Sequence, residues 1–157
     1  MGETERSKAV VVVVDDDAGA GGTIGRSFEE LVGVCLDTQH AWAAGMSFDT
    51  VDAADALVDE IDRTVGLDRL ACLHVNDSKT ARGAGLDRHE NVGRGTMGKA
   101  PFRALLGHPR LQGLPAVLEV PGTDEQGPDA RELRAVRRLH NEGIRLRVGS
   151  AQSLSGV

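Results

Sequence analysis

Seven side chains of the kinds that bind divalent metal ions lie at or near the ends of apolar segments of this sequence. Imidazole nitrogens and carboxylate oxygens are both good ligands for zinc, and one carboxylate can bridge two ions. Any one of these residues alone is more typical of a helix cap or a solvated loop. Because they recur at successive strand ends, they predict a metal site. The candidate ligands are Asp15, Asp37, His40, His74, Asp87, His89 and Glu119.

Two short motifs place such ligands within a few positions of each other. In Asp37-Thr38-Gln39-His40, a carboxylate and an imidazole are three positions apart where an apolar segment ends. In Asp87-Arg88-His89, two ligands are two positions apart, and alternate residues of an extended segment point to the same side. A single motif of either kind is weak evidence, but together they favour a site with several ligands.

Four apolar segments predict the strands that position these ligands. They are rich in Val and Leu and do not alternate with polar residues, which is typical of parallel strands covered on both faces. Helical patterns lie between them at residues 50–65, 100–106 and 129–142, and Gly143 is expected to end the last helix. This alternation predicts βα units whose strand ends form one rim. The predicted strands are residues 9–14, 32–36, 70–75 and 116–120.

Composition limits the classes of protein that fit. The 157 residues correspond to one domain, and 40% hydrophobic residues with only 3% aromatic residues predict an aliphatic core. A net charge of −6 argues against a general nucleic-acid binder with a basic surface. Three bound divalent ions would, however, add about six positive charges beside the carboxylates.

Cysteine usage and the first residues indicate the cell compartment. Cys35 and Cys72 each lie in an apolar segment and match no metal-ligand pair spacing, so we expect free, buried thiols in a reducing environment. The initial apolar run is too short to span a membrane, and no signal-type cleavage site follows it. We therefore expect a soluble, cytoplasmic protein that does not contact a membrane.

Runs of consecutive residues around the candidate ligands resemble apurinic/apyrimidinic endonucleases of the endonuclease IV type. Residues 34–45 (VCLDTQHAWAAG) are similar to the region around the sixth strand of that family, and residues 74–79 (HVNDSK) to its seventh. Residues 87–93 resemble the loop that follows, and residues 118–121 the eighth strand. Residues 17–31 resemble the exit of the fifth strand.

This resemblance implies a fold and an activity. The family has an α/β fold, a (β/α)8 TIM barrel with three zinc ions on its rim, and cleaves DNA 5′ to abasic sites. By resemblance, one zinc has the ligands His40, Asp87 and His89, and a second has Asp37, His74 and Glu119. Asp15 stands where the family has a bridging glutamate, one methylene longer. We expect about two zinc ions here, with manganese as the alternative metal.

The resemblance covers the C-terminal half of such a barrel, with about four parallel strands and an internal deletion. Residues 1–143 are expected to form this partial barrel, and residues 144–157 a tail that is disordered or adds one edge strand. A complete barrel needs roughly 250 residues. Because a half barrel exposes two sheet edges, we expect either a homodimer or a separate N-terminal half as partner.

The expected substrate is DNA that contains abasic sites, cleaved by metal-assisted hydrolysis in base excision repair. Asn76, Lys79 and Arg88 are candidates for positioning ligands or contacting phosphate. Two other functions stay open: a non-catalytic zinc-binding fragment, and a metal-dependent sugar isomerase or epimerase with a related barrel. The pairing of the motifs at 37–40 and 87–89 favours the endonuclease over the isomerase.

Three further features are interpreted as structural. Residues 93–98 fit the pattern G-x-G-x-x-G but do not directly follow a strand, so we expect a tight turn into the next helix rather than a dinucleotide site. His108 and His140 are expected at the surface. Trp42 is expected to pack against the top of the barrel, with stacking on a DNA base as the alternative.

Overall fold

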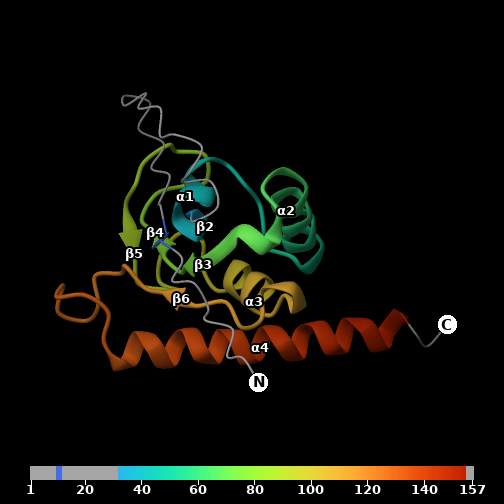
Figure 1. The fold of residues 1–157 in the computed structure, drawn as a ribbon. Coiled ribbons are helices and arrows are strands. Elements are labelled where there is room, and N and C mark those ends of the chain that lie inside the picture. The colour runs from blue at the N-terminus through green and yellow to red at the C-terminus, as the bar shows by residue number, and fades with distance from the viewer. Residues whose placement is uncertain (1–9, 12–31, 155–157) are drawn as a thin grey trace, which may run out of the picture.

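The computed structural model of the protein describes residues 10–11 and 32–154. Its main sheet is parallel throughout, with the strand order β1-β2-β3-β6 (Figure 1). The strands confirm the prediction of about four parallel strands, although the last is shorter than expected and most of the first predicted strand lies outside the described residues. No closed barrel forms among the described residues. The strands are β1 (Val10–Val11), β2 (Val32–Asp37), β3 (Leu70–His74) and β6 (Ala116–Val117).

Two of the predicted helices form where their patterns placed them. Helix α2 (Val51–Thr64) begins at Thr50, whose hydroxyl accepts a hydrogen bond from the backbone N–H of Ala53 at 3.1 Å. Gly66 follows the helix with a φ of 88°, a conformation that glycine adopts without a Cβ clash. Helix α3 (Ala100–Leu106) has a proline in its first turn, as expected.

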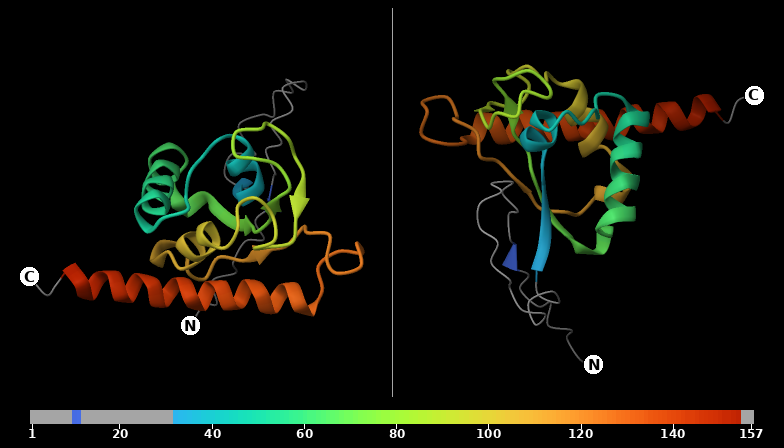
Figure 2. Two further views of the ribbon diagram at one scale, coloured as in Figure 1. Left: turned by 180° about the vertical axis from the view of Figure 1, so that it is seen from behind. Right: turned by 90° about the horizontal axis from the view of Figure 1, so that it is seen from above.

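Helix α4 (Ala130–Leu154) corrects two predictions, because it passes through Gly143 and covers most of the predicted tail. Gly143 does not end the helix; it lies against Gly107 after α3, and a Cβ on either glycine would collide with the backbone of the other segment. Glycine thus permits the close crossing of α3 and α4 that Figures 1 and 2 show. Beyond it, Arg147 donates hydrogen bonds to the carbonyl of Ala104 at 2.9 Å and to Asp55 at 2.6 Å, which anchors the continuation.

The hydrophobic core lies between the sheet and the helices α2, α3 and α4. Its largest fully buried apolar side chains are Phe48, Phe102 and Leu105, and the remainder are mostly leucine, valine and alanine. This confirms the aliphatic core predicted from composition. A short 3-10 helix, η2 (Leu67–Arg69), leads into β3, and a second, η3 (Pro109–Leu111), follows α3.

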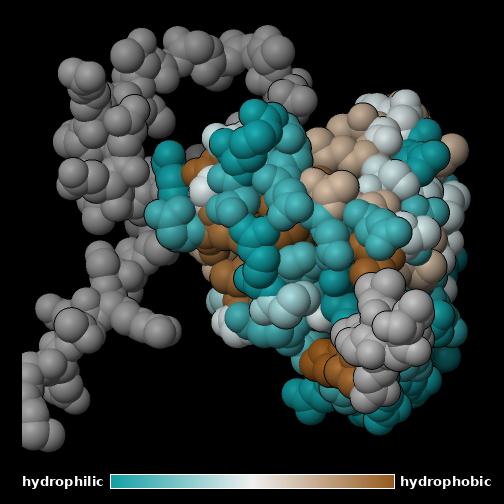
Figure 3. All heavy atoms as spheres, turned by 90° about the vertical axis from the view of Figure 1, so that its right-hand side faces the viewer, coloured by the Kyte–Doolittle hydropathy of each residue, from teal (hydrophilic) through white to brown (hydrophobic). Residues whose placement is uncertain are grey.

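Apolar side chains also remain on the surface. On the face drawn in Figure 3, hydrophobic residues form small groups among hydrophilic ones. Most of the large hydrophobic side chains that are exposed in the described residues belong to α4: Leu133, Ile144, Leu146 and Val148. The edge strand β6 adds Val117, which is 41% exposed. No helix among the described residues is long and apolar enough to cross a bilayer.

The loop at residues 93–98 wraps around one buried carboxylate, that of Asp77 in β4 (Asp77–Ser78). One oxygen of Asp77 accepts hydrogen bonds from the backbone N–H groups of Gly93 and Gly95, and the other from those of Ser78 and Met97, at 2.7–3.1 Å. Burial raises the pKa of Asp77, and these four donors oppose the shift because they stabilise the ionised form. The glycine-rich loop leads into α3, as the sequence predicted, and it also surrounds an internal carboxylate, which the sequence did not reveal.

His108 is not a surface residue as predicted, since only 4% of it is exposed. Its Nδ1 accepts a hydrogen bond from the backbone N–H of Arg110 at 3.2 Å, and its Nε2 lies 3.1 Å from a carboxylate oxygen of Asp55. Burial and the nearby Arg147 lower the pKa of His108. The neutral ring fits both contacts, because protonation would place a hydrogen between Nδ1 and the donating N–H. The other predicted surface histidine, His140, is partly exposed and contacts Gln112 at 2.8 Å.

We predict that His108 makes the fold less stable in mild acid. Its pKa is lowered in the folded state, so the unfolded chain binds the proton more tightly below the ordinary value of about 6.5. The stabilisation is present at neutral pH and is lost as the pH falls. Urea unfolding at several pH values should give a flatter pH dependence for His108→Gln. His140→Gln should keep the wild-type slope, and an unchanged slope in His108→Gln would refute the prediction.

We further predict that Asp77→Asn lowers the free energy of unfolding by about 2–3 kcal/mol, because an amide NH₂ would face two backbone donors and the charge would be lost. Urea denaturation measures the difference. Asp68→Asn, at an exposed position in η2, serves as the matched control and should change stability by less than about 0.5 kcal/mol. Equal effects of the two substitutions would contradict this role for Asp77.

Candidate metal centre

The first group of candidate ligands forms at the carboxyl ends of three neighbouring strands. Asp37 ends β2 and His74 ends β3, and the two residues are register partners in the parallel ladder. Glu119 follows the adjacent strand β6 by two residues. The Nδ1 atom of His74 lies 3.0 Å from a carboxylate oxygen of Glu119 and 3.5 Å from one of Asp37. The structure thus brings together the three residues assigned by resemblance to one zinc.

The second group combines α1 (Thr38–Ala43) with the loop that includes β5 (His89–Glu90). The Nε2 atom of His40 lies 3.4 Å from one carboxylate oxygen of Asp87, and that of His89 lies 3.1 Å from the other. Neither approach has the geometry of a hydrogen bond, so both buried Nε2 atoms have no hydrogen-bond partner within the described residues. The helix α1 was not predicted, and it turns His40 toward β5 directly after β2 ends.

The tautomer of His89 is fixed by the backbone. Its Nδ1 atom lies 2.8 Å from the carbonyl oxygen of Glu119. A carbonyl only accepts, so Nδ1 carries the proton and the lone pair is on Nε2, the atom that faces Asp87. Histidines that bind metal ions usually donate their other N–H in this way.

Asp37 joins the two groups. One ligand atom from each of Asp37, His74 and Glu119 lies within 4.8 Å of the others, and the same holds for Asp37, His40 and His89. By resemblance Asp37 belonged to one ion only, whereas its position here also faces the histidines of the other group. A carboxylate has two oxygens, so this position suits a bridging ligand.

Local hydrogen bonds hold the Asp37 carboxylate in place. One of its oxygens accepts from the backbone N–H groups of Gln39 at 2.7 Å and His40 at 3.1 Å, which caps α1. The other accepts from the side-chain amide of Asn76 at 2.9 Å. Asp37 therefore starts the helix that presents His40 and also occupies the candidate site.

Asn76 does not present its side chain to DNA, as one interpretation of the sequence expected. It is fully buried, and its amide oxygen accepts a hydrogen bond from the backbone N–H of Glu119 at 2.8 Å. Its amide nitrogen donates to Asp37, so Asn76 links the positions of two candidate ligands. Positioning of ligands was one of the two roles that the sequence suggested for Asn76, but the sequence did not identify its partners, because they lie far from Asn76 along the chain.

The remaining predicted site residues lie around this centre. Lys79 and Arg88 are both exposed, and the backbone N–H of Lys79 donates to the carbonyl of Arg88 at 2.9 Å. Asp15 lies outside the described residues. Trp42 is partly buried beside Phe48, and its ring N–H donates to the carbonyl of Thr80 at 3.3 Å.

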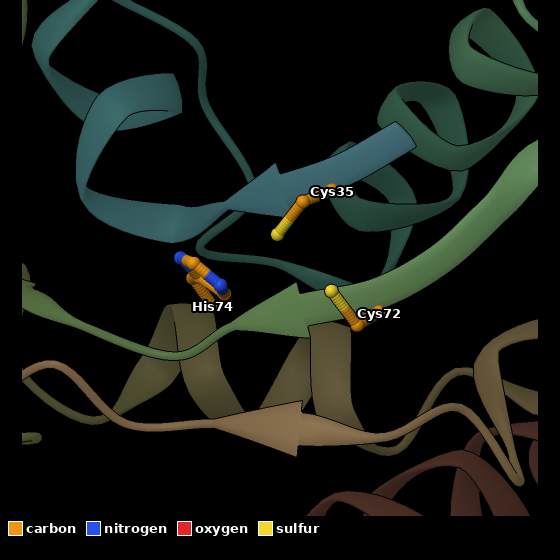
Figure 4. Close-up of side chains that lie close together, drawn as sticks. All are labelled: Cys35, Cys72 and His74. Atoms are coloured by element: carbon orange, nitrogen blue, oxygen red, sulfur yellow. The ribbon is translucent and has the colours of Figure 1, made fainter. Parts of the chain in front are cut away.

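Two thiols lie two residues before Asp37 and His74 along β2 and β3. Cys35 and Cys72 are free, as predicted, although Cys35 is only partly buried. They are register partners on β2 and β3, and Figure 4 shows them with His74. Burial and a hydrogen bond with Cys72 raise the pKa of Cys35 to about 12. The spacing of the two cysteines along the chain did not reveal that they are neighbours.

A hollow of about 240 Å³ lies elsewhere, between η3, β6 and α4. Its lining is mostly leucine and valine side chains together with Gln112, Arg137 and His140, and it includes none of the candidate ligands. The candidate metal ligands therefore lie at the rim of the sheet and not in this hollow.

The side chains at the rim fit a divalent cation. Within the described residues, the ion pairs of Asp37, Asp87 and Glu119 are all with histidines, and none is with lysine or arginine. Asp37 and Glu119 place carboxylate oxygens within 4.8 Å of each other without a permanent cation, and a metal ion would relieve their mutual repulsion. The buried Nε2 atoms of His40 and His89 have no hydrogen-bond partner within the described residues, and a metal ion would accept their lone pairs.

Comparisons with known proteins agree with this geometry. Residues 22–140 match the family described as the xylose isomerase-like TIM barrel. A probable endonuclease 4 of Chlorobium limicola is 42% identical over 132 residues, which is 76% of this chain and 46% of the relative. One of Geobacter sulfurreducens is 39% identical over 141 residues, covering 82% and 48%. The chain thus spans about half the length of the curated relatives it matches.

A solved structure supports the same relationship. The crystal structure of endonuclease IV from Thermus thermophilus superposes with a TM-score of 0.58 and 38% identity, covering 71% of this chain and 39% of that chain. The described strands and helices therefore correspond to part of an α/β barrel. With a rim of histidines and carboxylates at the strand ends and relatives of about 40% identity, the chain belongs to the endonuclease IV family of the xylose isomerase-like TIM barrels.

Proposed function

We propose that this chain carries part of the active site of a zinc-dependent endonuclease that hydrolyses DNA 5′ to abasic sites. The observation that carries the proposal is the convergence of two ligand groups on Asp37, with two buried imidazole nitrogens that lack hydrogen-bond partners. Relatives named endonuclease 4 give independent support for nucleic-acid cleavage over sugar isomerisation.

The ligand roles follow the two groups. His40, Asp87 and His89 would hold one zinc ion, and His74 and Glu119 would hold a second. Asp37 faces both ligand groups and could serve either ion. The mixed nitrogen and oxygen donors favour zinc over ions such as magnesium, which prefer oxygen ligands alone.

In this proposal the protein side chains hold and orient the metal ligands, and the metal would supply the positive charge that hydrolysis needs. When bound, zinc would activate a water molecule and neutralise the phosphate oxygens. His89 keeps its lone pair on Nε2 through the carbonyl of Glu119, and Asn76 holds Asp37 at the rim. The exposed Lys79 and Arg88 contact the DNA backbone, which the net charge of −6 would otherwise repel.

We also propose that this rim works with a partner, either a second copy or a separate N-terminal half of the barrel. Support comes from β6, an edge strand whose Ala116 and Val117 are both exposed. The exposed apolar residues of α4 lie on the helix that packs beside this part of the fold. Unpaired strand edges with apolar side chains favour pairing with another chain.

The first prediction from this proposal is that the purified chain holds about two zinc ions, the number that two ligand groups accommodate. Elemental analysis of the size-fractionated protein measures this content. His89→Ala should remove about one ion per chain because it deletes a ligand, whereas His140→Ala, on α4, should leave the content unchanged. A chain without bound metal, or equal losses in both variants, would contradict the ligand assignment.

The second prediction concerns DNA cleavage. A duplex with one abasic site should be incised on its 5′ side, and a chelator should abolish incision. Asn76→Ala should reduce incision and zinc affinity by roughly 10–100-fold, because the ligands Asp37 and Glu119 lose their common support. Incision that persists without metal would refute a zinc-dependent reaction. A folded chain that binds zinc tightly but incises no DNA would support the non-catalytic alternative instead.

A further inference from the structure

A second cluster of ligand-type side chains lies beneath the carboxylate rim. Cys35 comes from β2, and Cys72 and His74 come from β3. One ligand atom from each of the three lies within 4.8 Å of the others. In Figure 4 the two sulfur atoms point toward each other between the strands, and His74 lies beside them at the end of β3.

The register of the sheet produces this cluster. Cys35 pairs with Cys72, and two positions farther along Asp37 pairs with His74. Because alternate residues of a strand point to the same face, the thiols and the candidate zinc ligands form two layers on one face. The upper layer has oxygen and nitrogen donors, and the lower layer has two sulfur atoms.

We propose that Cys35 and Cys72, together with His74 from the rim, form a further binding site for a thiophilic metal ion, such as Cd²⁺, Cu⁺ or Zn²⁺. Two thiolates and one imidazole are ligands that such ions prefer, whereas Mg²⁺, Ca²⁺ and Mn²⁺ prefer oxygen. Binding forms two metal–sulfur bonds and releases two thiol protons to the solvent. The site goes beyond the proposed nuclease function, which uses neither thiol.

Burial and backbone pairing make the site well ordered. Cys72 and His74 are both buried, and the strands that carry the two thiols are paired in the interior of the sheet order β1-β2-β3-β6. The thiols have no disulfide, so both sulfur atoms are free to bind. A metal ion here needs only small side-chain rotations, because the three ligand atoms already lie close together.

The test is titration of the reduced, metal-stripped chain with Cd²⁺ alone, followed by ultraviolet absorption. Thiolate-to-cadmium charge transfer gives an absorption band that oxygen and nitrogen ligands do not produce. We expect this band to saturate at about one Cd²⁺ per pair of thiols. Cys35→Ser and Cys72→Ser should each lower the band by at least half, with folding checked by circular dichroism.

His89→Ala is the matched control, since His89 belongs to the other ligand group of the rim and is not one of the three ligands of the proposed site. It should weaken zinc binding at the rim but keep the cadmium–thiolate band, which separates this site from the proposed nuclease site. Absence of the band in the wild-type chain, or a band that survives both cysteine substitutions, would overturn the proposal. If either serine variant unfolds, cadmium NMR of the wild-type chain decides, because sulfur ligation shifts the resonance far from that of oxygen-bound cadmium.

Discussion

The parallel pairing of β2 with β3 is the constraint on which the functional part of this molecule depends. The register shifts between Val34 and Cys35 and is regular from Cys35 to Asp37. It sets Asp37 beside His74 and, two positions lower, Cys35 beside Cys72. Since side chains alternate between faces of a strand, a slip of one residue would remove one partner of each pair from the shared face. One ladder of backbone hydrogen bonds therefore determines both the candidate metal rim and the proposed thiol site.

Buried polar side chains transmit this register to the loops. Asn76 ties Asp37 to the backbone of Glu119. Asp77 accepts hydrogen bonds from three N–H groups at residues 93–97 and from that of Ser78. Asn76 and Asp77 both have hydrogen-bond partners, so hydrogen bonds offset the free-energy cost of removing these side chains from water. The loop can then position His89 although its only regular secondary structure there is the two-residue strand β5. This arrangement explains why the loops that form the site are ordered although the sheet has few and short strands.

The predictable part of the site is the part with local motifs. Asp37 and His40 share one strand end, Asp87 and His89 share one loop, and both pairs were identified from spacing and resemblance. Asn76 was a candidate for positioning ligands or contacting phosphate, and the sequence did not choose between these roles because its partners are distant in sequence. The proximity of Cys35 to Cys72 was not predicted for the same reason, since strand order and register decide which residues become neighbours.

The sequence by itself indicated the strands of the main sheet, the helices α2 and α3, and the candidate ligand residues, because apolar runs, helical periodicity and motif spacing are local properties. Only the tertiary structure decided that α4 continues past Gly143, because the closeness of Gly107 depends on how two helices cross. It also decided that His108 is buried, since Asp55 and Arg110 meet it from separate elements. The tertiary structure also made Asp37 the residue shared by both candidate ligand groups. The other ligands of these groups lie in α1, β3 and β5 and just after β6, and no single segment of the sequence shows that these elements come together around Asp37.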